Sequence, residues 1–381
     1  MQPIDFAPSQ RVHVRRVPSG YWAFIPPPLP PILEFDASLV TTLSEADRAL
    51  GRLAGVGSSL PNPYLLITPF LRREAVLSSR IEGTQATLSE LVLFEAIPGA
   101  RAGTNDLREV ANHVEALETG IAPDQPLPLS LRLIRDLHGV LMTGVRGQER
   151  TPGEFRTSQN WIGPPGAVIN NSTFVPPPPD EMLQALDRLE RYLHASPDLP
   201  PIMRLALIHY QFEAIHPFLD GNGRVGRLLM SLLLHHWQLL PQPLLYLSAF
   251  FERHRNDYYR LLLEVSTKGA WQPWISFFAT AVADQATDVL ARSGRLLDLR
   301  EEYRARLVGA RTSSLPLRLV DVLFMRPAIT IGGAQEALGV TWRSAQLNVE
   351  KLVQAQIVEE VTRQPRNRVY LAREIVGLLE E

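Results

Sequence analysis

The sequence predicts an all-α fold with minor β structure. Helical patterns dominate from about residue 38 onward. The segment from Ile202 to Ile215 is apolar nearly all round, which marks it as the central buried helix. Extended residues around proline and glycine between 153 and 179 predict one irregular hairpin. The expected helices cover about residues 38–54, 68–82, 87–96, 105–119, 129–143, 180–195, 201–215, 223–239, 255–267 and 273–307.

Composition indicates an ordinary chain of two or three domains, with 381 residues, 45% hydrophobic and 20% charged. It has no cysteine, which excludes disulfide and thiolate chemistry. The formal charge of -2 gives no global attraction to nucleic acid. The first residues lack a basic segment followed by an apolar one, and no uncharged apolar stretch reaches about 18 residues. We therefore expect a cytoplasmic protein without a membrane partner.

Changes in the sequence pattern along the chain predict three regions, which cover residues 1–110, 111–310 and 311–381. Residues 1 to 35 read as irregular and end in a stiff, proline-rich arm over Pro26–Pro31. The helix over 68–82 is expected to begin with Thr68 as its cap and Pro69 in its first turn.

The last region reads as a winged helix-turn-helix. Ala334–Leu338, Gly339 and Thr341–Leu352 suit the two helices and their turn. Val358–Val361 and Arg368–Leu371 flank Gln364-Pro365-Arg366-Asn367 as a wing. Four arginines are placed to meet phosphates, but they fit a solvated face equally, and many winged helices bind protein instead. They are Arg343, Arg363, Arg366 and Arg368.

The richest segment is the loop His216–Arg227, which reads His-Pro-Phe-Leu-Asp-Gly-Asn-Gly-Arg-Val-Gly-Arg. Pro217 disfavours helical geometry at His216, so a helix should end there. Gly221 and Gly223 allow the backbone to come close to a ligand. The helix that follows would turn its free N–H groups and positive dipole end toward an oxyanion.

The charges of this loop indicate a magnesium nucleotide. Arg224 and Arg227 lie one turn apart, and each can offer a planar fork of donors to phosphate oxygens. Asp220 would repel phosphate unless a divalent cation lay between them, and Mg²⁺ binds through one carboxylate plus substrate phosphates. Singly, each residue also fits a cap, a turn or a solvated helix face.

The loop resembles the signature of the Fic family, His-x-Phe-x-Asp/Glu-Gly-Asn-Gly-Arg-x-x-Arg, at every fixed position. The resemblance implies a Fic-type helical core with a β-hairpin flap over 155–178. It also implies an AMP transferase that moves the adenylyl group of ATP onto a Tyr, Thr or Ser hydroxyl of a protein, itself included, and releases diphosphate. The cofactor it implies is Mg²⁺ or Mn²⁺, with ATP as co-substrate.

The resemblance assigns a role to each signature residue. His216 is the general base, and its unperturbed pKa of about 6.5 suits that task. Asp220 is the metal ligand, Arg224 holds the β-phosphate and Arg227 the γ-phosphate. Phe218 is a core anchor that pins the loop. The implied ATP-binding residues are Glu82, Asp220, Gly221, Asn222, Gly223, Arg224, Val225, Gly226, Arg227, Tyr258 and Tyr259.

Upstream, Ser78-Ser79-Arg80-Ile81-Glu82-Gly83 resembles the Fic inhibitory motif, Ser/Thr-x-x-x-Glu-Gly/Asn. The resemblance pairs Glu82 with Arg227, where the carboxylate takes the place of the γ-phosphate. Ser78, Glu82 and Gly83 then form an inhibitory element that precedes the catalytic core.

Two further segments resemble parts of the family's site. Residues 153–163 resemble the flap, an edge hairpin that holds the target by main-chain pairing. Its expected target-binding residues are Asn160, Trp161, Ile162 and Gly163. Tyr258 and Tyr259 resemble the paired tyrosines of the adenine pocket, although such a pair is as often part of a core.

Two other functions remain open. His209, Glu213 and His216 fall at i, i+4 and i+7 on one helix face, as the ligands of a metal-dependent hydrolase would. That interpretation leaves the glycines and arginines unexplained. The chain also fits a transcription regulator whose core only senses nucleotide. A homodimer and DNA binding by the last region are further candidate associations, and the target protein is not encoded in these motifs.

Overall fold

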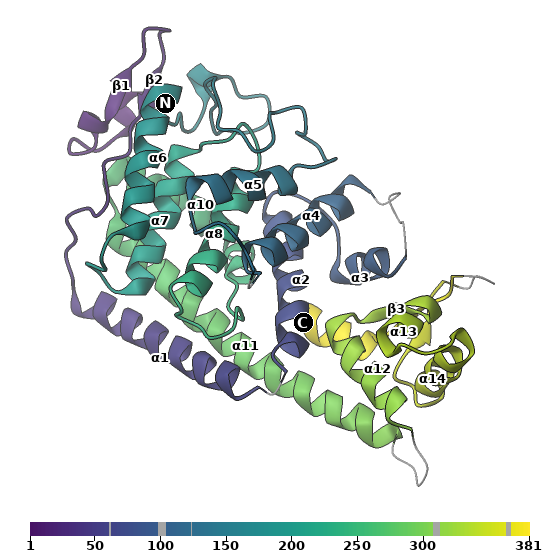
Figure 1. Cartoon of the computed structure of the whole chain (residues 1–381). Helices are drawn as coiled ribbons and strands as arrows, with labels where there is room; N and C mark the ends of the chain where they lie inside the picture. The colour runs from purple at the N-terminus through teal and green to yellow at the C-terminus, as the bar shows by residue number, and fades with distance from the viewer. Residues whose placement is uncertain (61, 98–103, 123, 308–312, 363–366) are drawn as a thin grey trace.

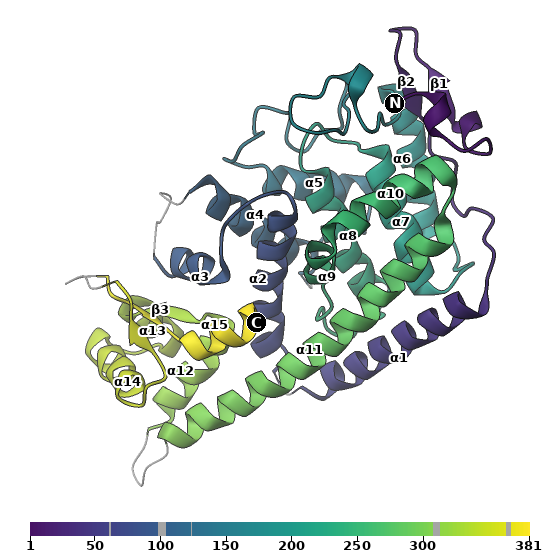
Figure 2. The same cartoon turned by 180° about the vertical axis from the view of Figure 1, so that it is seen from behind.

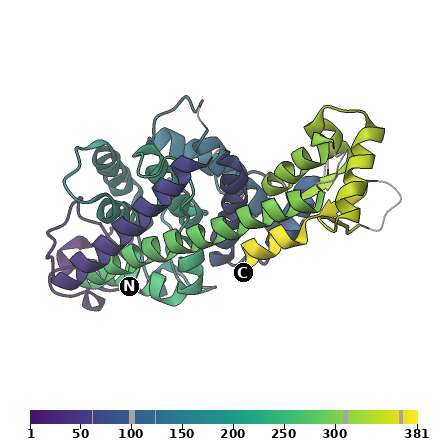
Figure 3. The same ribbon diagram turned by 90° about the horizontal axis from the view of Figure 1, so that it is seen from below.

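The computed structural model describes residues 1–60, 62–97, 104–122, 124–307, 313–362 and 367–381, and it confirms a mostly helical fold (Figure 1). The central helix is α7 (Pro201–Ile215), which is buried on nearly all sides. Helix α8 (Asn222–His236) and the long helix α11 (Trp271–Leu307) both pack against it. Helix α1 (Ala37–Ser59) runs alongside α11, as Figures 1 and 3 show from two directions.

None of the described helices of the chain is long and apolar enough to cross a membrane. The remaining helices of the first 270 residues surround this centre. Their bounds are α3 Leu88–Ala96, α4 Asn105–Gly120, α5 Leu131–Leu141, α6 Pro179–His194, α9 Ser248–Arg253 and α10 Arg255–Lys268, with a 3₁₀ turn at Ile169–Asn171.

Helix α2 (Tyr64–Ile81) begins one turn earlier than the sequence indicated. Thr68 is not its cap, and Pro69 lies inside the helix and is buried. A proline there costs the hydrogen bond to the carbonyl four residues earlier, at Leu65. Burial of Leu66 and Phe70 favours the helix all the same. The C-terminal end is as expected, because Gly83 turns the chain with a φ of 103°.

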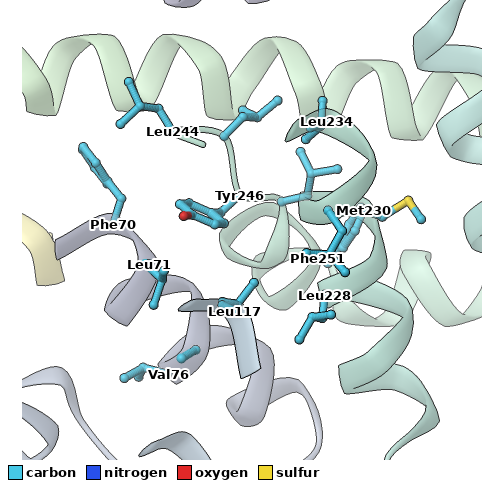
Figure 4. Close-up of a cluster of buried hydrophobic side chains, with 14 of the residues drawn as sticks. Phe70, Leu71, Val76, Leu117, Leu228, Met230, Leu234, Leu244, Tyr246 and Phe251 are labelled. Atoms are coloured by element: carbon cyan, nitrogen blue, oxygen red, sulfur yellow. The ribbon is translucent and has the colours of Figure 1, made fainter. Parts of the chain in front are cut away.

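The α2 helix is part of the core. Figure 4 shows Phe70, Leu71 and Val76 of α2 facing side chains of α4, α8 and α9 in one apolar cluster. In the cluster, Leu117 comes from α4 and Leu228 from α8. Helix α2 is therefore packed against α4, α8 and α9 within the core.

The first 35 residues are not wholly irregular, which corrects the sequence-based expectation. Two 3₁₀ turns, Pro3–Asp5 and Arg11–His13, precede an antiparallel pair of strands, β1 (Val14–Arg16) and β2 (Trp22–Phe24). Phe24 supplies the reason: its ring is fully buried and stacks on Phe6 with centroids 5.6 Å apart. Three-residue strands carry too short an alternation to be recognised in a sequence.

The C-terminal region contains the predicted helices and turn. Its elements are α12 Ser314–Met325, β3 Ala328–Thr330, α13 Ile331–Leu338, α14 Trp342–Gln354, β4 Glu359–Glu360, β5 Val369–Leu371 and α15 Arg373–Glu380. The three strands form an antiparallel sheet in the order β3-β5-β4. Gly339, with a φ of 66°, joins α13 to α14. Arg363, Gln364, Pro365 and Arg366 lie outside the described residues, and assignment to the winged-helix class stays a prediction.

This region packs against α2. Helices α12 and α15 both contact it, and Figure 2 shows α15 reaching back toward it. The Arg73 side chain of α2 pairs with Asp288 of α11 at 3.1 Å, and Arg292 of α11 donates to the carbonyl of Leu378 at 2.6 Å. Because α2 contacts every region, the boundaries at 110 and 310 also stay predictions.

Candidate nucleotide site

The segment after α7 has the sharp turn that its sequence indicated. Helix α7 ends at Ile215, and His216 takes a left-handed conformation with a φ of 50°. Phe218 is fully buried, as expected of an anchor. Its ring stacks on that of His138 with centroids 3.8 Å apart.

Asn222 closes the loop with its side chain. Its Oδ1 accepts from the Phe218 amide and its Nδ2 donates to the Phe218 carbonyl, both at 2.8 Å. Gly221 has a φ of 76°, which favours glycine. Helix α8 starts at Asn222, so the N–H groups of its first turn have no acceptor within the helix. The loop thus presents a helix N-terminus to the cleft.

That cleft has a volume of about 750 Å³ and collects residues from five parts of the chain. Ten of the predicted site residues line it: Glu82, Trp161, Ile162, Gly163, His216, Asp220, Gly223, Arg227, Tyr258 and Tyr259. Its volume lies in the range of cavities that bind small molecules and cofactors. The other predicted residues, among them Asn222 and Arg224, do not line the cleft.

Glu82 and Arg227 are in direct contact. The Glu82 Oε1 atom lies 2.7 Å from Arg227 Nη2. The same guanidinium donates to Ser78 through Nε to the hydroxyl and through Nη2 to the carbonyl, each at 2.9 Å. Burial by itself would raise the pKa of the Glu82 carboxyl, but Arg227, aided by Arg224, holds that pKa below its usual range. Glu82 is therefore ionised at neutral pH.

The Glu82 carboxylate occupies the start of α8. A Cβ atom built on Gly223 would lie 2.3 Å from Glu82 Oε1 and 3.0 Å from Arg227 Nη1. The carboxylate thus rests where the helix dipole and the first-turn amides favour negative charge. Glycine at 223 leaves room for an anion at this point.

Arg224 points elsewhere. It is 4% exposed, and its Nη1 lies 3.4 Å from Glu109 Oε2 on α4. Its Nε, like Nη1 of Arg227, has no hydrogen-bond partner among the described residues. Buried donors without acceptors are costly, so both arginines have capacity for a further anionic partner.

The His216 imidazole is a neutral base in this structure. Its Nδ1 lies 3.3 Å from the carbonyl of Glu213, which can only accept, so Nδ1 carries the proton and Nε2 has the free lone pair. Burial, aided by the charge of Arg156, lowers the pKa of His216 to about 4. The value of about 6.5 expected for an unperturbed imidazole therefore does not hold.

The hydrolase triad is not formed. His209 is fully buried, with Nε2 2.8 Å from the Tyr258 hydroxyl and Nδ1 3.3 Å from the Gly226 carbonyl. Both ring nitrogens are thus committed. Among the described residues, no three His, Cys, Asp or Glu side chains are placed to hold a metal ion. A single carboxylate, Asp220, faces the cleft from the loop.

Glu213 has a different environment from that expected of a ligand. A Cβ atom built on Gly226 would lie 2.2 Å from Oε1 of Glu213. That oxygen has no hydrogen-bond partner in the described chain. Burial, with a smaller contribution from Glu82, raises the pKa of Glu213 to about 7, although Arg227 opposes the rise.

The two tyrosines differ from each other. Tyr258 is 1% exposed and packs on Phe251 and Trp274, so much of it belongs to the core. Tyr259 is 42% exposed at the mouth of the cleft. Arg255 lies over the Tyr259 ring at 5.7 Å.

The flap is an irregular hairpin with a single antiparallel bridge in its described backbone, between Ile162 and Phe174. Trp161 and Ile162 expose apolar surface, 41% and 39%. Asn160 instead faces the signature loop, where its Nδ2 donates to the carbonyls of His216 at 3.2 Å and Phe218 at 2.8 Å.

Sequence reasoning missed three residues that support the loop: Glu109, His138 and Arg156. His138 Nδ1 accepts from the Gly153 amide at 2.9 Å, so its Nε2 carries the proton and donates to the Asp220 carbonyl at 3.1 Å. Burial lowers the pKa of His138 to about 4, which keeps this tautomer neutral. No local pattern distinguishes these three residues from surface or core positions.

A helix N-terminus, the Arg227 guanidinium, a neutral histidine and the Asp220 carboxylate meet at one cleft, an arrangement suited to a class of protein that binds a polyanion and takes up a proton beside it. Residues 40–122 match the model of the Fic/DOC family N-terminal region, and residues 128–234 match the Fic/DOC family model. These two segments of the chain therefore belong to the Fic/DOC family.

Known proteins agree with that membership. The chain is 31% identical over 208 residues to the protein adenylyltransferase Fic of Drosophila yakuba, and this match covers 52% of the chain and 38% of that protein. With the Drosophila grimshawi protein of the same name the identity is 33% over 157 residues, and the match covers 41% of the chain and 29% of that protein. The chain thus spans well under half the length of these relatives.

Solved structures share the fold. A Fic family protein from Desulfovibrio desulfuricans G20 superposes with a TM-score of 0.59 at 20% identity, covering 90% of this chain and 98% of that one. Fic-1 from C. elegans gives a TM-score of 0.51 at 20% identity, with 68% and 74% covered.

Proposed function

We propose that the chain is a protein adenylyltransferase that moves AMP from ATP to a Tyr, Thr or Ser hydroxyl of a target protein and of itself. One observation carries the proposal: an anion site at the start of α8, built from Gly223 and Arg227, lies in the same cleft as a neutral His216. The name of the Drosophila relatives supports the same activity.

In the proposed reaction, Nε2 of His216 takes the proton of the target hydroxyl. The hydroxyl oxygen bonds to the α-phosphorus, the bond from that phosphorus to the bridging oxygen breaks, and diphosphate leaves. Transfer of this kind depends on positioning and on neutralising charge at the leaving oxygens. The positive charge of Arg227 and the N–H groups of Asn222 and Gly223 in the first turn of α8 neutralise the negative charge of those oxygens.

Arg224 would join them as the β-phosphate ligand. To do so it must turn from Glu109, and the 3.4 Å contact between them is long for a charged pair. Its unpartnered Nε fits a state with a further acceptor. Gly221, Val225 and Gly226 contribute backbone shape around the phosphates.

The loop fits a divalent cation that is held by one carboxylate and by substrate phosphates. Asp220 Oδ1 accepts from the Gly221 amide at 2.7 Å, which orients the carboxylate. Its Oδ2 lies 2.8 Å from where a Cβ on Gly147 would be, so glycine there keeps that oxygen uncovered. Mg²⁺ or Mn²⁺ at Asp220 would neutralise the negative charge of the α- and β-phosphates.

We propose that the present arrangement is the inhibited one. The Glu82 carboxylate on Arg227 holds the place of the γ-phosphate, so ATP competes with Glu82 for the same guanidinium. Gly83 ends α2, and Ser78 holds Arg227 against that helix. Removal of the Glu82 carboxylate should free the site.

The flap and the tyrosines complete the proposed site. Target main chain would pair at the edge beside Trp161, Ile162 and Gly163, all of which line the cleft. Tyr258 and Tyr259 would face the adenine. Association with DNA, with a second copy of the chain or with a particular target, and a cytoplasmic location, remain predictions from the sequence.

The kind of group transferred tests the proposal directly. The Glu82→Gly variant is incubated with Mg²⁺ and ATP that carries label at either the α- or the γ-phosphate. We expect protein-bound label from α-labelled ATP alone, because the adenylyl group is retained and diphosphate leaves. Incorporation from γ-labelled ATP would instead identify phosphoryl transfer and overturn the proposal.

A further inference from the structure

Arg156 is a buried cation that binds only main-chain carbonyls. It is 2% exposed, and no carboxylate lies within ion-pair distance of it in the described chain. Its guanidinium donates from Nε to the carbonyl of His216 at 2.9 Å and from Nη1 to Ser158 at 3.2 Å. Its Nη2 donates to Pro177 at 2.5 Å and to Ile215 at 3.4 Å.

These four carbonyls belong to three segments of the chain. Ile215 and His216 lie at the C-terminal end of α7, Ser158 lies near the start of the flap, and Pro177 lies near its end, beyond the Ile162–Phe174 bridge. The Arg156 amide also donates to the Pro217 carbonyl at 2.9 Å. One residue thus connects both ends of the flap to the main chain of the proposed base.

The chemistry of this contact calls for arginine. A planar guanidinium has five N–H donors in a fixed fork, whereas a lysine ammonium has three and no preferred plane. A positive charge at the C-terminus of α7 also meets the negative end of its dipole. Burial is nonetheless expensive for a cation without a counterion, and it lowers the pKa of Arg156 to about 10. Neutral donors would form hydrogen bonds of a purely structural kind at a lower desolvation cost.

His216 needs such support. Its φ of 50° is uncommon outside glycine, and a strained residue persists only when its surroundings hold it. Asn160 of the flap donates to the same His216 carbonyl, at 3.2 Å. The two flap residues therefore hold the base from its main-chain side.

We propose that Arg156 is a positioning residue that fixes the flap and His216 in one geometry, so that a hydroxyl held on the flap meets Nε2 of the base. This role rests on the proposed transferase function. It predicts that Arg156 governs the rate of transfer and leaves ATP affinity unchanged, because the phosphate ligands lie in α8 and Arg156 touches none of them.

The chain provides a matched control in Arg204, near the other end of α7. It is 4% exposed and donates through Nη2 to the carbonyls of Tyr192 at 2.9 Å and Ala195 at 3.3 Å. Twelve residues of helix place it about 18 Å from His216. Unlike Arg156, it also lies 4.0 Å from a carboxylate oxygen, Oδ1 of Asp198. It is thus a buried, carbonyl-binding arginine in the helix that His216 follows, and its described hydrogen bonds reach no residue of the flap.

The test measures self-labelling by Arg156→Gln, Arg156→Lys and Arg204→Lys, each combined with Glu82→Gly. We expect a loss of roughly 100-fold in the maximal rate for Arg156→Gln, as for misplacement of a reacting group by about 1 Å. Arg156→Lys should recover part of the rate, and the ATP KM should stay within about threefold in both. Arg204→Lys should label at the rate of the Glu82→Gly parent, even if its melting temperature falls as far as that of Arg156→Gln.

Three results would overturn the proposal: a parent-like rate in Arg156→Gln, a rate loss in Arg204→Lys that matches it at equal melting temperature, or a parallel loss of ATP affinity. Amide hydrogen exchange gives a second measurement that needs no activity. Arg156→Gln should speed exchange both at the flap amides between residues 158 and 177 and at the amides of His216 and Phe218. If the Glu82→Gly parent does not label, the transferase proposal fails, and exchange changes confined to one segment would reject the positioning role independently.

Discussion

The Glu82–Arg227 pair is asymmetric. Arg227 is 2% exposed in its side chain and keeps two contacts to Ser78, whereas Glu82 is 34% exposed at the last turn of α2. The arginine is therefore held in place by α2 itself, and the carboxylate faces the cleft. A ligand that displaces Glu82 meets a guanidinium that is already positioned.

The first prediction concerns the two adjacent serines of α2. Ser78→Ala removes the acceptor for Arg227 Nε and leaves a charged donor buried and unpaired, which should lower the free energy of unfolding by roughly 1–3 kcal/mol. Ser79 is equally buried, but its hydroxyl has no partner among the described residues. Ser79→Ala should therefore be near neutral. Urea unfolding compares the two; equal losses would mean that the Ser78 contact adds no stability.

The second prediction uses the close approach of Gly223 to the ion pair. Gly223→Ala places a methyl group against Glu82 Oε1 and Arg227 Nη1, so the pair must separate. In a helix the same change is favourable by up to about 1 kcal/mol when nothing obstructs it. We expect it to be destabilising in the wild type and neutral or stabilising in Glu82→Gly. A double-mutant cycle by thermal unfolding measures this coupling, and additive effects would contradict the contact.

The third prediction follows from the buried carboxyl of Glu213. Because its folded pKa is raised to about 7 from 4.5, the native state favours the protonated form. Its contribution to stability is fully present below pH 4.5 and is lost as the pH rises through 7. Glu213→Gln should match the wild type at pH 4.5 and exceed it at pH 8, by an amount on the order of 1–2 kcal/mol. The difference between their unfolding free energies across pH isolates this group, and a flat difference would refute the raised pKa.

Local motifs predicted the parts of the site that lie within one short segment. The turn at His216, the buried Phe218 and the start of α8 all depend on neighbours in sequence, because Pro217 and the glycines act on the adjacent backbone. The approach of Glu82 to Arg227, 145 residues apart, was accessible only through resemblance to a family motif. Residue chemistry by itself would have left Glu82 on the surface.

The supporting residues were beyond such reasoning for a physical reason. Arg156 binds carbonyls, and every residue has one, so its sequence neighbours carry no trace of its partners. Glu109 and His138 act through tertiary contacts to Arg224 and Asp220. Tertiary burial likewise moved the start of α2 to Tyr64, despite the proline inside the helix.

In the proposed function the cleft transfers AMP with His216 as base and is restrained by Glu82. Intact-mass measurement of wild type, Glu82→Gly and His216→Ala after incubation with Mg²⁺ and ATP examines both roles in one experiment. We predict addition of adenylyl groups that is greatest in Glu82→Gly, weak in the wild type and absent in His216→Ala. Equal labelling of all three proteins would contradict both the catalytic role of His216 and the inhibitory role of Glu82.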